Sequence, residues 1–342
     1  MRRVLQILIA LGLGLALGLG QSACGSFQDP DIVVDVRVLA MEADLPEQVL
    51  DIDLANPPTA GDLLAQVMPS TMCALVTDPY NARRLKWAMT LCPLSGDERC
   101  NTGDPQALLA SGFEDDPDLT QPEPTMCATV KPDADLLAVV MNTLDGDQLH
   151  GLSGIDYEVA LRVGGEGGDP NLDLYASKSL RISARFPAQR TANANPSLSE
   201  WDATPFDADD NPTTPTPLAL GRCVDQPSPL VVAPHAKLRF TPVEPDGVRE
   251  TYVVPTTDGM VATFTESLTY AWTATYGSFS SGSTGGPRDI SGNAAPLFTD
   301  WTAPRAEDLA DPTQPTDVAL WVVERDERLG AHWYESCVRV VP

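Results

Sequence analysis

Residues 318–340 carry the most regular hydrophobic pattern in the chain. Two runs rich in β-branched and aromatic residues flank a polar turn that contains Gly330, which predicts a β-hairpin. A similar pattern occurs about half a chain earlier, where residues 159–163 and 175–182 surround the glycine-rich turn 164–168. Each copy closes one half of the chain, so the sequence predicts two β modules.

A second repeated element supports this division. Residues 85–91 and 268–276 each alternate apolar and polar positions around a central tryptophan, Trp87 or Trp272. Residues 133–141 fit a strand or a short helix, because periodicity does not decide short apolar runs. In the run 32–40, all the even-numbered positions are expected on one face. Further strands are expected at 32–40, 49–54, 71–76, 125–130, 230–232, 237–241, 250–254 and 297–301.

The composition changes between the two halves. From Phe186 to Pro229 the chain is rich in Pro, Asn, Thr and Asp, and we expect few of these residues to fill a core. The predicted organisation is a signal at 1–23, a tether at 24–31, one domain at 32–186, a Pro-rich acidic linker at 187–221 and a second domain at 222–342. A length of 342 residues agrees with about two domains.

The N-terminus predicts export. An uncharged apolar run, residues 4–20, follows Arg2 and Arg3. It is shorter than the ~20 residues that a membrane-spanning helix needs, and small residues end it, which is typical of a cleaved signal peptide. An uncleaved N-terminal anchor is the alternative.

Cys24 follows Ala23 directly after this run, which resembles the lipobox of bacterial lipoproteins. In that family the cysteine is lipidated and begins the mature protein, so the resemblance implies a lipid anchor on Cys24. Gln21 stands where the family usually has an apolar residue, and conventional cleavage near Ala23 is the rival prediction. Gly25 differs from the aspartate that retains many lipoproteins at the inner membrane, which implies an outer-membrane lipoprotein facing the periplasm or the cell surface.

Six further cysteines form an even set, which predicts disulfides in an exported chain. None belongs to a Cys-x-x-Cys pair, so a zinc site is not expected. Six cysteines allow fifteen connectivities. Locality favours the pairs Cys73 with Cys127, Cys92 with Cys100, and Cys223 with Cys337.

The position of Cys337 departs from a simple core strand. It alternates with Trp333 and Glu335, whereas Val338 and Val340 share the opposite parity. This predicts either a bulge near Cys337 or a disulfide that lies off the main core face.

The repeated short strands, tryptophan strand and terminal hairpin resemble the immunoglobulin-like sandwich, in which a core tryptophan packs near an inter-sheet disulfide. The expected fold class is all-β, with two tandem immunoglobulin-like antiparallel β-sandwich domains after a cleaved N-terminal signal. The whole chain is similar to uncharacterised lipoproteins of the myxobacterial type with tandem immunoglobulin-like domains, and this resemblance implies no specific activity.

The strongly negative net charge limits the classes of partner that the protein is expected to bind. The formal net charge of −26 disfavours nucleic acid and anionic lipid head groups. One acidic loop, with Asp207, Asp209 and Asp210, resembles calcium-binding linkers between cadherin-like repeats. Calcium is the only cofactor that the sequence suggests, and the alternative is a solvated acidic linker.

Few residues indicate catalysis. His150, His235 and His332 belong to no hydrolase motif, so we predict that the protein is not an enzyme. Trp321 and Trp333 are expected roughly opposite each other across the closing hairpin. They form either a structural aromatic pair or an exposed platform for a sugar ring or a partner surface.

The sequence therefore predicts an exported, lipid-anchored cell-envelope protein with a structural or interaction role and an unidentified protein or glycan partner. One alternative is a pair of carbohydrate-binding modules that use the hairpin tryptophans. A further alternative is a hydrolase whose site is assembled from loops.

Overall fold

The computed structural model describes residues 30–52, 59–79, 83–96, 98–114, 126–147, 151, 153–256 and 260–342. The predicted signal, Cys24 and His150 lie outside the described residues. The described chain is all-β, as predicted, with four larger sheets and one two-stranded sheet. None of the helices in the described ranges has the length and apolar character needed to cross a membrane.

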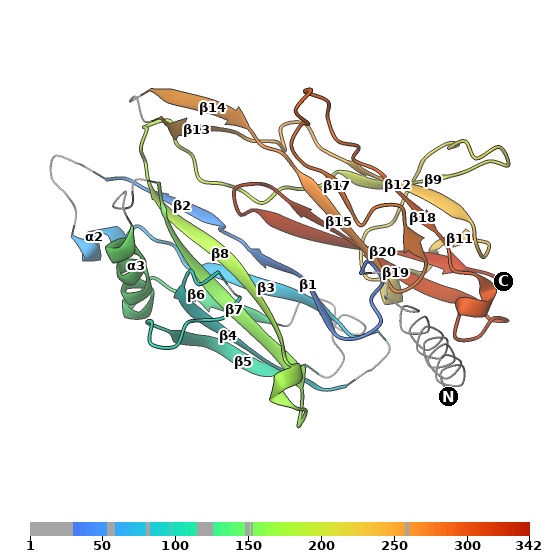
Figure 1. The fold of residues 1–342 in the computed structure, drawn as a ribbon, viewed down its shortest axis with the longest axis horizontal. Coiled ribbons are helices and arrows are strands. Elements are labelled where there is room, and N and C mark those ends of the chain that lie inside the picture. Colours follow the sequence, from blue (N-terminus) through green and yellow to red (C-terminus); the bar gives the residue numbers. More distant parts are fainter. Residues whose placement is uncertain are drawn as a thin grey trace, which may run out of the picture.

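The first half forms two facing sheets (Figure 1). The smaller has the order β1 (Arg37–Ala43), β3 (Ser70–Thr77) and β6 (Cys127–Val130). The larger has the order β2 (Glu47–Leu50), β8 (Leu174–Ala184), β7 (Ile155–Gly165), β4 (Leu85–Pro93) and β5 (Ala107–Glu114). The helices of this half are α2 (Ala60–Leu64), α3 (Ala134–Gly146) and the short 3₁₀ helix η1 (Pro170–Leu172).

The second half repeats the two-sheet arrangement. One sheet has the order β10 (Thr216–Pro217), β9 (Glu200–Pro205), β12 (Lys237–Val243), β18 (Thr299–Thr302) and β16 (Ser278–Phe279). The other has the order β11 (Leu230–Val232), β20 (Ala331–Val340), β19 (Thr316–Arg325), β15 (Thr269–Ala274) and β17 (Ser283–Gly285). A separate hairpin joins β13 (Thr251–Pro255) to β14 (Val261–Thr265), and the 3₁₀ helices are η2 (Cys223–Asp225) and η3 (Ala306–Asp308).

The predicted repeat is present. Each half contains its hairpin, β7–β8 or β19–β20, paired with its tryptophan strand, β4 or β15. Trp87 lies opposite Val163 in one sheet, and Trp272 lies opposite Val322 in the other. The prediction of purely antiparallel sheets is wrong at two edges, because β2 pairs with β8 and β11 pairs with β20 in parallel. These partners are far apart in sequence, so no tight turn imposes an antiparallel pairing.

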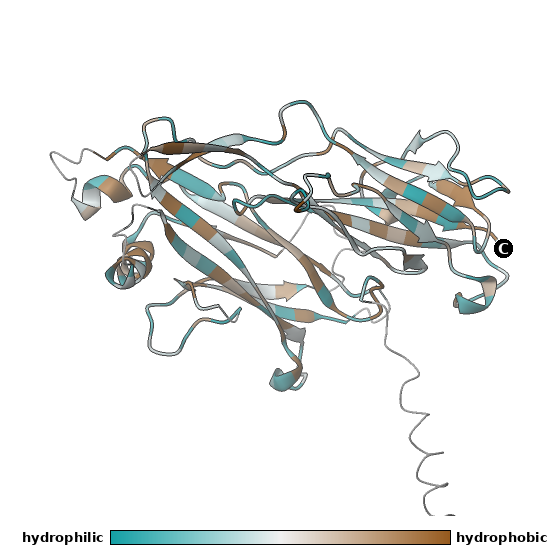
Figure 2. Ribbon diagram, turned by 45° about the horizontal axis from the view of Figure 1, so that its top comes forward, coloured by the Kyte–Doolittle hydropathy of each residue, from teal (hydrophilic) through white to brown (hydrophobic). Residues whose placement is uncertain are grey.

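Alternating side chains build one core in each half. Figure 2 shows hydrophobic and hydrophilic positions alternating along the long strands, which leaves one apolar face on each sheet. The first core includes Met72, Trp87 and Leu161, and helix α3 adds Leu136 and Val139. The second core is formed by Trp201, Phe240, Tyr270, Trp272, Trp301, Leu320, Val338 and their neighbours. Both halves are therefore sandwiches.

A third cluster, here called the junction cluster, joins the two sandwiches. It brings Ala40 of β1 and Leu75 of β3 against Trp321 and Val323 of β19. Strand β19 is thus apolar on both faces, since Val318, Leu320 and Val322 point into the second core. The full junction cluster is Val33, Ala40, Leu75, Cys223, Ala319, Trp321, Val323 and Cys337.

Two expectations about local structure need correction, and one open alternative is decided. Residues 200–205 of the predicted linker form β9, and Trp201 is only 1% exposed in the second core. The segment was expected to supply few core residues, but Leu198, Trp201, Ala203 and Leu218 all belong to the second core, because one large aromatic side chain compensates for many polar neighbours. In the run 32–40 a β-bulge between Val38 and Ala40 places Val38 on the first core and Ala40 on the junction cluster. Of the two alternatives predicted for residues 133–141, the helix is present: α3 begins at Ala134, and the side chain of its N-cap Asp133 accepts from the backbone N–H groups of Asp135 and Leu136.

Candidate functional site

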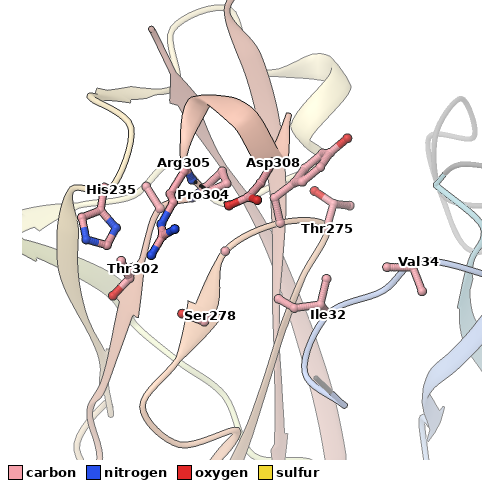
Figure 3. Close-up of a pocket in the computed structure, with 12 residues that line it drawn as sticks. Ile32, Val34, His235, Thr275, Ser278, Thr302, Pro304, Arg305 and Asp308 are labelled. Carbon is pink, nitrogen blue, oxygen red and sulfur yellow. Dashed lines mark hydrogen bonds between the residues drawn. The ribbon is translucent and has the colours of Figure 1, made fainter. Parts of the chain in front are cut away.

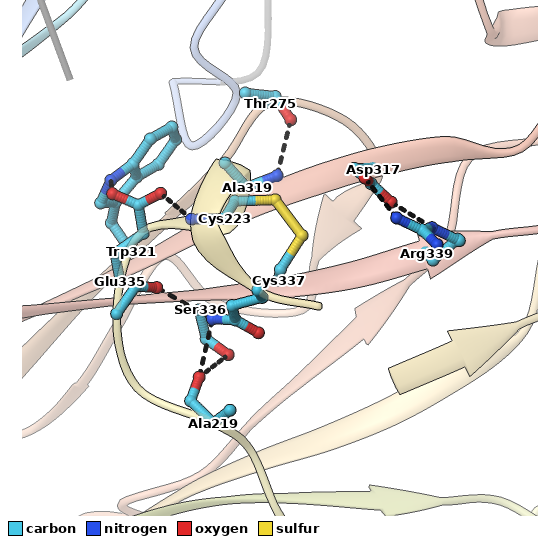
Figure 4. The surroundings of a disulfide bond; sticks show 12 residues. Ala219, Cys223, Thr275, Asp317, Ala319, Trp321, Glu335, Ser336, Cys337 and Arg339 are labelled. Carbon is cyan, nitrogen blue, oxygen red and sulfur yellow. Dashed lines mark hydrogen bonds and ion pairs between the residues drawn. A yellow bond between two sulfur atoms is a disulfide. The ribbon is translucent and has the colours of Figure 1, made fainter. Parts of the chain in front are cut away.

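The Cys223–Cys337 disulfide lies in the junction cluster (Figure 4). Cys223 belongs to η2, a 3₁₀ turn, and Cys337 belongs to β20. The carboxylate of Glu335 accepts from the backbone N–H of Cys223 at 2.6 Å and from Trp321 Nε1 at 3.1 Å (Figure 4). Glu335 therefore ties the disulfide and the indole together.

The unusual parity of Cys337 now has an explanation. The pairing of β19 with β20 runs without interruption from Thr316 opposite Val340 to Arg325 opposite Ala331, so no bulge shifts Cys337. Cys337 lies on the face that packs toward the first sandwich, whereas Val338 and Val340 lie in the second core. The disulfide is thus off the main core face, the second of the two predicted possibilities.

The other two predicted disulfides are also present. Cys73 and Cys127 are direct partners on adjacent strands β3 and β6, and Cys92 at the end of β4 joins Cys100 in the next loop. Neither of them spans two facing sheets, and the third disulfide joins the turn η2 to β20. The arrangement of a core tryptophan against an inter-sheet disulfide is therefore absent from the described residues.

The hairpin tryptophans do not form a sugar-binding platform. Trp321 is 0% exposed, and Trp333 is half-buried against the junction cluster. Their strand partners are Glu335 and Val323 respectively, so the two rings are diagonal neighbours and not direct opposites. Because the first ring cannot reach solvent, the carbohydrate-binding prediction based on this pair is wrong.

The described histidines have no nucleophile beside them. His332 Nδ1 lies 2.8 Å from Glu42 Oε2, and this hydrogen bond raises the pKa of His332. His235, whose backbone φ is +62°, lines a cavity of about 580 Å³ together with Thr302, Ser278 and Arg305 (Figure 3). Among the described residues, no hydroxyl or thiol is hydrogen-bonded to either ring. The described part of the chain therefore shows no relay of the kind a loop-assembled hydrolase needs.

The acidic loop lies in the connection between β9 and β10. Asp207 Oδ1 accepts from the backbone N–H groups of Asp209 and Asn211 at 2.9 Å, and Asp210 pairs with Lys237 Nζ at 3.1 Å. Over the described ranges, no group of three or more His, Cys, Asp or Glu side chains is arranged to hold a metal ion. Calcium binding by Asp207, Asp209 and Asp210 stays a prediction, which calcium titration monitored by thermal unfolding would test.

A buried set of charges, here called the junction ion network, was missed by the sequence analysis. It consists of Glu47, Arg190, Glu250, Glu266 and Arg328. Glu47 of β2 accepts from Arg190 Nη2 and from Arg328 Nη2, both at 2.8 Å, although it is only 3% exposed. Arg328 lies in the turn of the closing hairpin, so the network connects the two sandwiches directly.

The predicted linker takes part in this connection. Asn193 is 4% exposed, and its backbone N–H donates to Glu47 at 3.1 Å while its Nδ2 donates to Asp326 at 2.9 Å. Asn195 donates to the carbonyl oxygen of Ala43 and accepts from the backbone N–H of Ala331. Asn193 and Asn195 of the predicted linker therefore bond to both sandwiches.

Burial and charge shift the network's carboxyl groups in opposite directions. Burial alone would raise the pKa of Glu47, but the hydrogen bond from Ser183 and the guanidinium groups of Arg190 and Arg328 outweigh it, and the net pKa is lowered. Burial, aided by the charge of Asp326, raises the pKa of Glu266 to about 7. Glu47 thus carries a fixed negative charge near neutral pH.

A further buried carboxyl group belongs to strand β19. Glu324 is 0% exposed, and burial raises its pKa to about 7. Its Oε1 accepts from the hydroxyl of Tyr270 at 3.0 Å, while its Oε2 has no partner among the described residues. A protonated carboxyl group fits this environment better than a carboxylate.

Comparisons with known proteins identify no family. No family model matches the chain, and no curated protein matches it. Among solved structures, the N-terminal region of an enterococcal surface protein is 8% identical, covers 91% of this chain and 98% of its own, and has a TM-score of 0.22. A Salmonella α-2-macroglobulin is 11% identical over 92% of this chain and 17% of its own, at a TM-score of 0.20. Dimeric latent PorU from Porphyromonas gingivalis is 10% identical over 90% of this chain and 24% of its own, at a TM-score of 0.18. These scores are too low to define a shared fold or function.

Proposed function

We propose that the chain is an exported cell-envelope protein with a structural or protein-interaction role and no catalytic activity. The observation that carries this proposal is the junction, where a buried apolar cluster and a buried ion network hold two sandwiches together. A fixed pair of sandwiches suits a scaffold or a spacer, whose task is to present a surface at a defined position. The organisation as two tandem immunoglobulin-like domains belongs to the same proposal.

The disulfide-bonded cysteines support a location outside the cytoplasm. The three disulfides agree with an oxidising environment outside the cytoplasm, where such bonds persist. The apolar run at residues 4–20 and the small residues before Cys24 supply the matching export signal. Cys24 carries the lipid in this proposal, and the mature protein is anchored to the outer membrane through it.

Mass spectrometry of the native N-terminus tests the anchor. The wild-type chain is expected in the membrane fraction with a diacylated or triacylated Cys24 as its first residue. A Cys24→Ser variant is expected in the soluble envelope fraction or as an unprocessed precursor, because one or two acyl chains supply most of the membrane affinity. A mature wild-type chain that begins at Cys24 without lipid would refute the anchor and leave the scaffold role to be judged on the junction.

A further inference from the structure

A cavity of about 540 Å³ lies beside the junction ion network. Hairpin β13–β14 forms one side of it and the end of the first sandwich forms the other; Figure 1 shows this hairpin lying beside the end of β8. The lining combines two kinds of side chain. Arg181, Arg190 and Arg328 supply guanidinium groups, and Phe186, Val254 and Pro255 are among the residues that supply apolar surface.

Part of the guanidinium hydrogen-bonding capacity is unused. Arg190 donates only through Nη2, to Glu47, Ser183 and the carbonyl oxygen of Ser153, and within the described residues its Nε and Nη1 donate to nothing. Arg181 donates to Asp156 through Nε and Nη2, which leaves its Nη1 without an acceptor in the same ranges. Because guanidinium groups present N–H donors in a fixed plane, these free donors favour a planar acceptor.

Each arginine around the cavity is paired with at least one carboxylate. Arg181 pairs with Asp156, Arg190 with Glu47, and Arg328 with Glu47, Glu250 and Glu266. Among the described residues these carboxyl groups balance the three guanidinium groups, so an anion would be held by the N–H donors that they leave unused and not by a local excess of positive charge.

We propose that this cavity binds a carboxylate joined to an apolar group, such as the C-terminus of a peptide that ends in leucine. The carboxylate would accept two parallel hydrogen bonds from a guanidinium group, the geometry that arginine provides for carboxylates. The apolar group would pack on Phe186 and Val254, which are 43% and 39% exposed without a ligand. The volume is within the range of small-ligand sites. The inference does not depend on the lipid anchor or on the scaffold role.

Isothermal titration calorimetry on the mature chain tests this proposal with three probes. They are acetyl-Ala-Ala-Leu with a free C-terminus, the same peptide with a C-terminal amide, and N-acetylleucine. The free acid is expected to bind at least about tenfold more tightly than the amide, because the charged acceptor is lost in the amide. Binding of the peptide alone points to a peptide C-terminus, and binding of N-acetylleucine as well points to small carboxylic acids in general.

Two variants locate the binding. Val254→Trp fills the cavity from an exposed strand position without touching the ion network, and it is expected to weaken binding at least about tenfold. Arg190→Lys keeps the charge but removes the planar fork, and a similar loss is expected. Arg162→Lys is the matched control, since Arg162 pairs with Asp173 and does not line the cavity.

Three results would overturn the proposal. They are equal affinity for the acid and the amide, no binding of any probe, and unchanged binding by a folded Val254→Trp variant. If Arg190→Lys prevents folding, the Val254→Trp result decides, because that side chain lies outside every core cluster.

Discussion

Glu324 illustrates how burial sets the behaviour of a single residue. Its carboxyl group has a pKa of about 7 in the fold, against an ordinary value of 4.5. The folded chain therefore holds more protons than the unfolded chain between about pH 4.5 and pH 7, and its stability falls as the pH rises through this window. At about 1.4 kcal/mol per unit, this group alone accounts for up to about 3 kcal/mol.

Glu324→Gln is expected to remove this dependence. The amide cannot ionise, so the free energy of unfolding of the variant should change less between pH 4.5 and pH 8 than that of the wild type. Urea denaturation across this range measures the difference. The pH dependence of the unfolding free energy that remains in the variant is assigned to two other groups. These are Glu266, whose pKa is also about 7, and His332, whose raised pKa likewise makes stability fall as the pH rises.

The control for this prediction is Glu166→Gln, at a pair with Arg84 in which both side chains are about half exposed. Exposed pairs contribute about 1 kcal/mol or less, so its pH profile should follow that of the wild type. Identical pH profiles for Glu324→Gln and the wild type would show that Glu324 does not titrate in this window.

Substitutions at Trp321 and Trp333 compare the unfolding free energy contributed by a buried indole with that contributed by a half-buried one. Trp321→Phe leaves a cavity in the junction cluster and removes a donor from the buried carboxylate of Glu335. We expect Trp321→Phe to lower the free energy of unfolding by about 2 kcal/mol or more, and Trp333→Phe to lower it by about 1 kcal/mol or less. Chemical denaturation of both variants measures this, and equal small losses would mean that the junction cluster contributes little.

At the scale of elements, the disulfides differ in the length of chain that they close. Cys223 and Cys337 are 114 residues apart, whereas Cys92 and Cys100 are 8 apart. In the chain-entropy model the long closure is worth about 5 kcal/mol and the short one about 2.5 kcal/mol.

Replacing both cysteines of a pair by alanine is therefore expected to lower the unfolding free energy more for Cys223 and Cys337 than for Cys92 and Cys100. The long pair has a further cost, because Cys337 packs in the junction cluster while Cys100 is only partly buried. Thermal and urea unfolding of the two double variants under oxidising conditions provide the comparison. A larger loss for the short pair would show that native-state contacts outweigh closure of the chain.

Elements with a strong local pattern could be predicted from the sequence. The two hairpins and the two tryptophan strands were predictable because alternation, turn residues and β-branched side chains agree there. Strand β9 was missed because Trp201 stands among polar and proline residues, in a run too short to show a period. The helix at 134–146 depended on its cap at Asp133 and on packing against the first core.

The junction was harder to predict for a different physical reason. The continuous apolar run of β19 signals burial on both faces, but no local pattern says what covers the outer face. Arg328 and Glu47 look like surface charges in the sequence, because a long side chain in a polar turn is normally solvated. Their roles appear only when contacts between residues 281 positions apart are known.

At the scale of the whole molecule, the junction determines whether the halves unfold together. The junction cluster and the ion network connect β1, β2 and β3 of the first sandwich to the β19–β20 hairpin of the second, and Asn193 and Asn195 bond to both sides. We expect the wild type to unfold in one transition, since each sandwich would expose buried charge and apolar surface if its neighbour unfolded alone.

Arg328→Met tests this coupling. The change removes the cation shared by Glu47 and Glu266, and breaking one partner of a buried pair typically costs about 3–5 kcal/mol. Because this free energy is lost at the contact between the two sandwiches, we expect calorimetry to show two unfolding transitions in place of one. The first of them should occur at a lower temperature than the single transition of the wild type. Arg339→Met is the matched control on the same hairpin, since its pair with Asp317 is more than a third exposed on both sides and is screened by solvent. A single, unshifted transition for a folded Arg328→Met variant would mean that the two sandwiches are held together without this network, and that the rigid scaffold depends on the junction cluster alone.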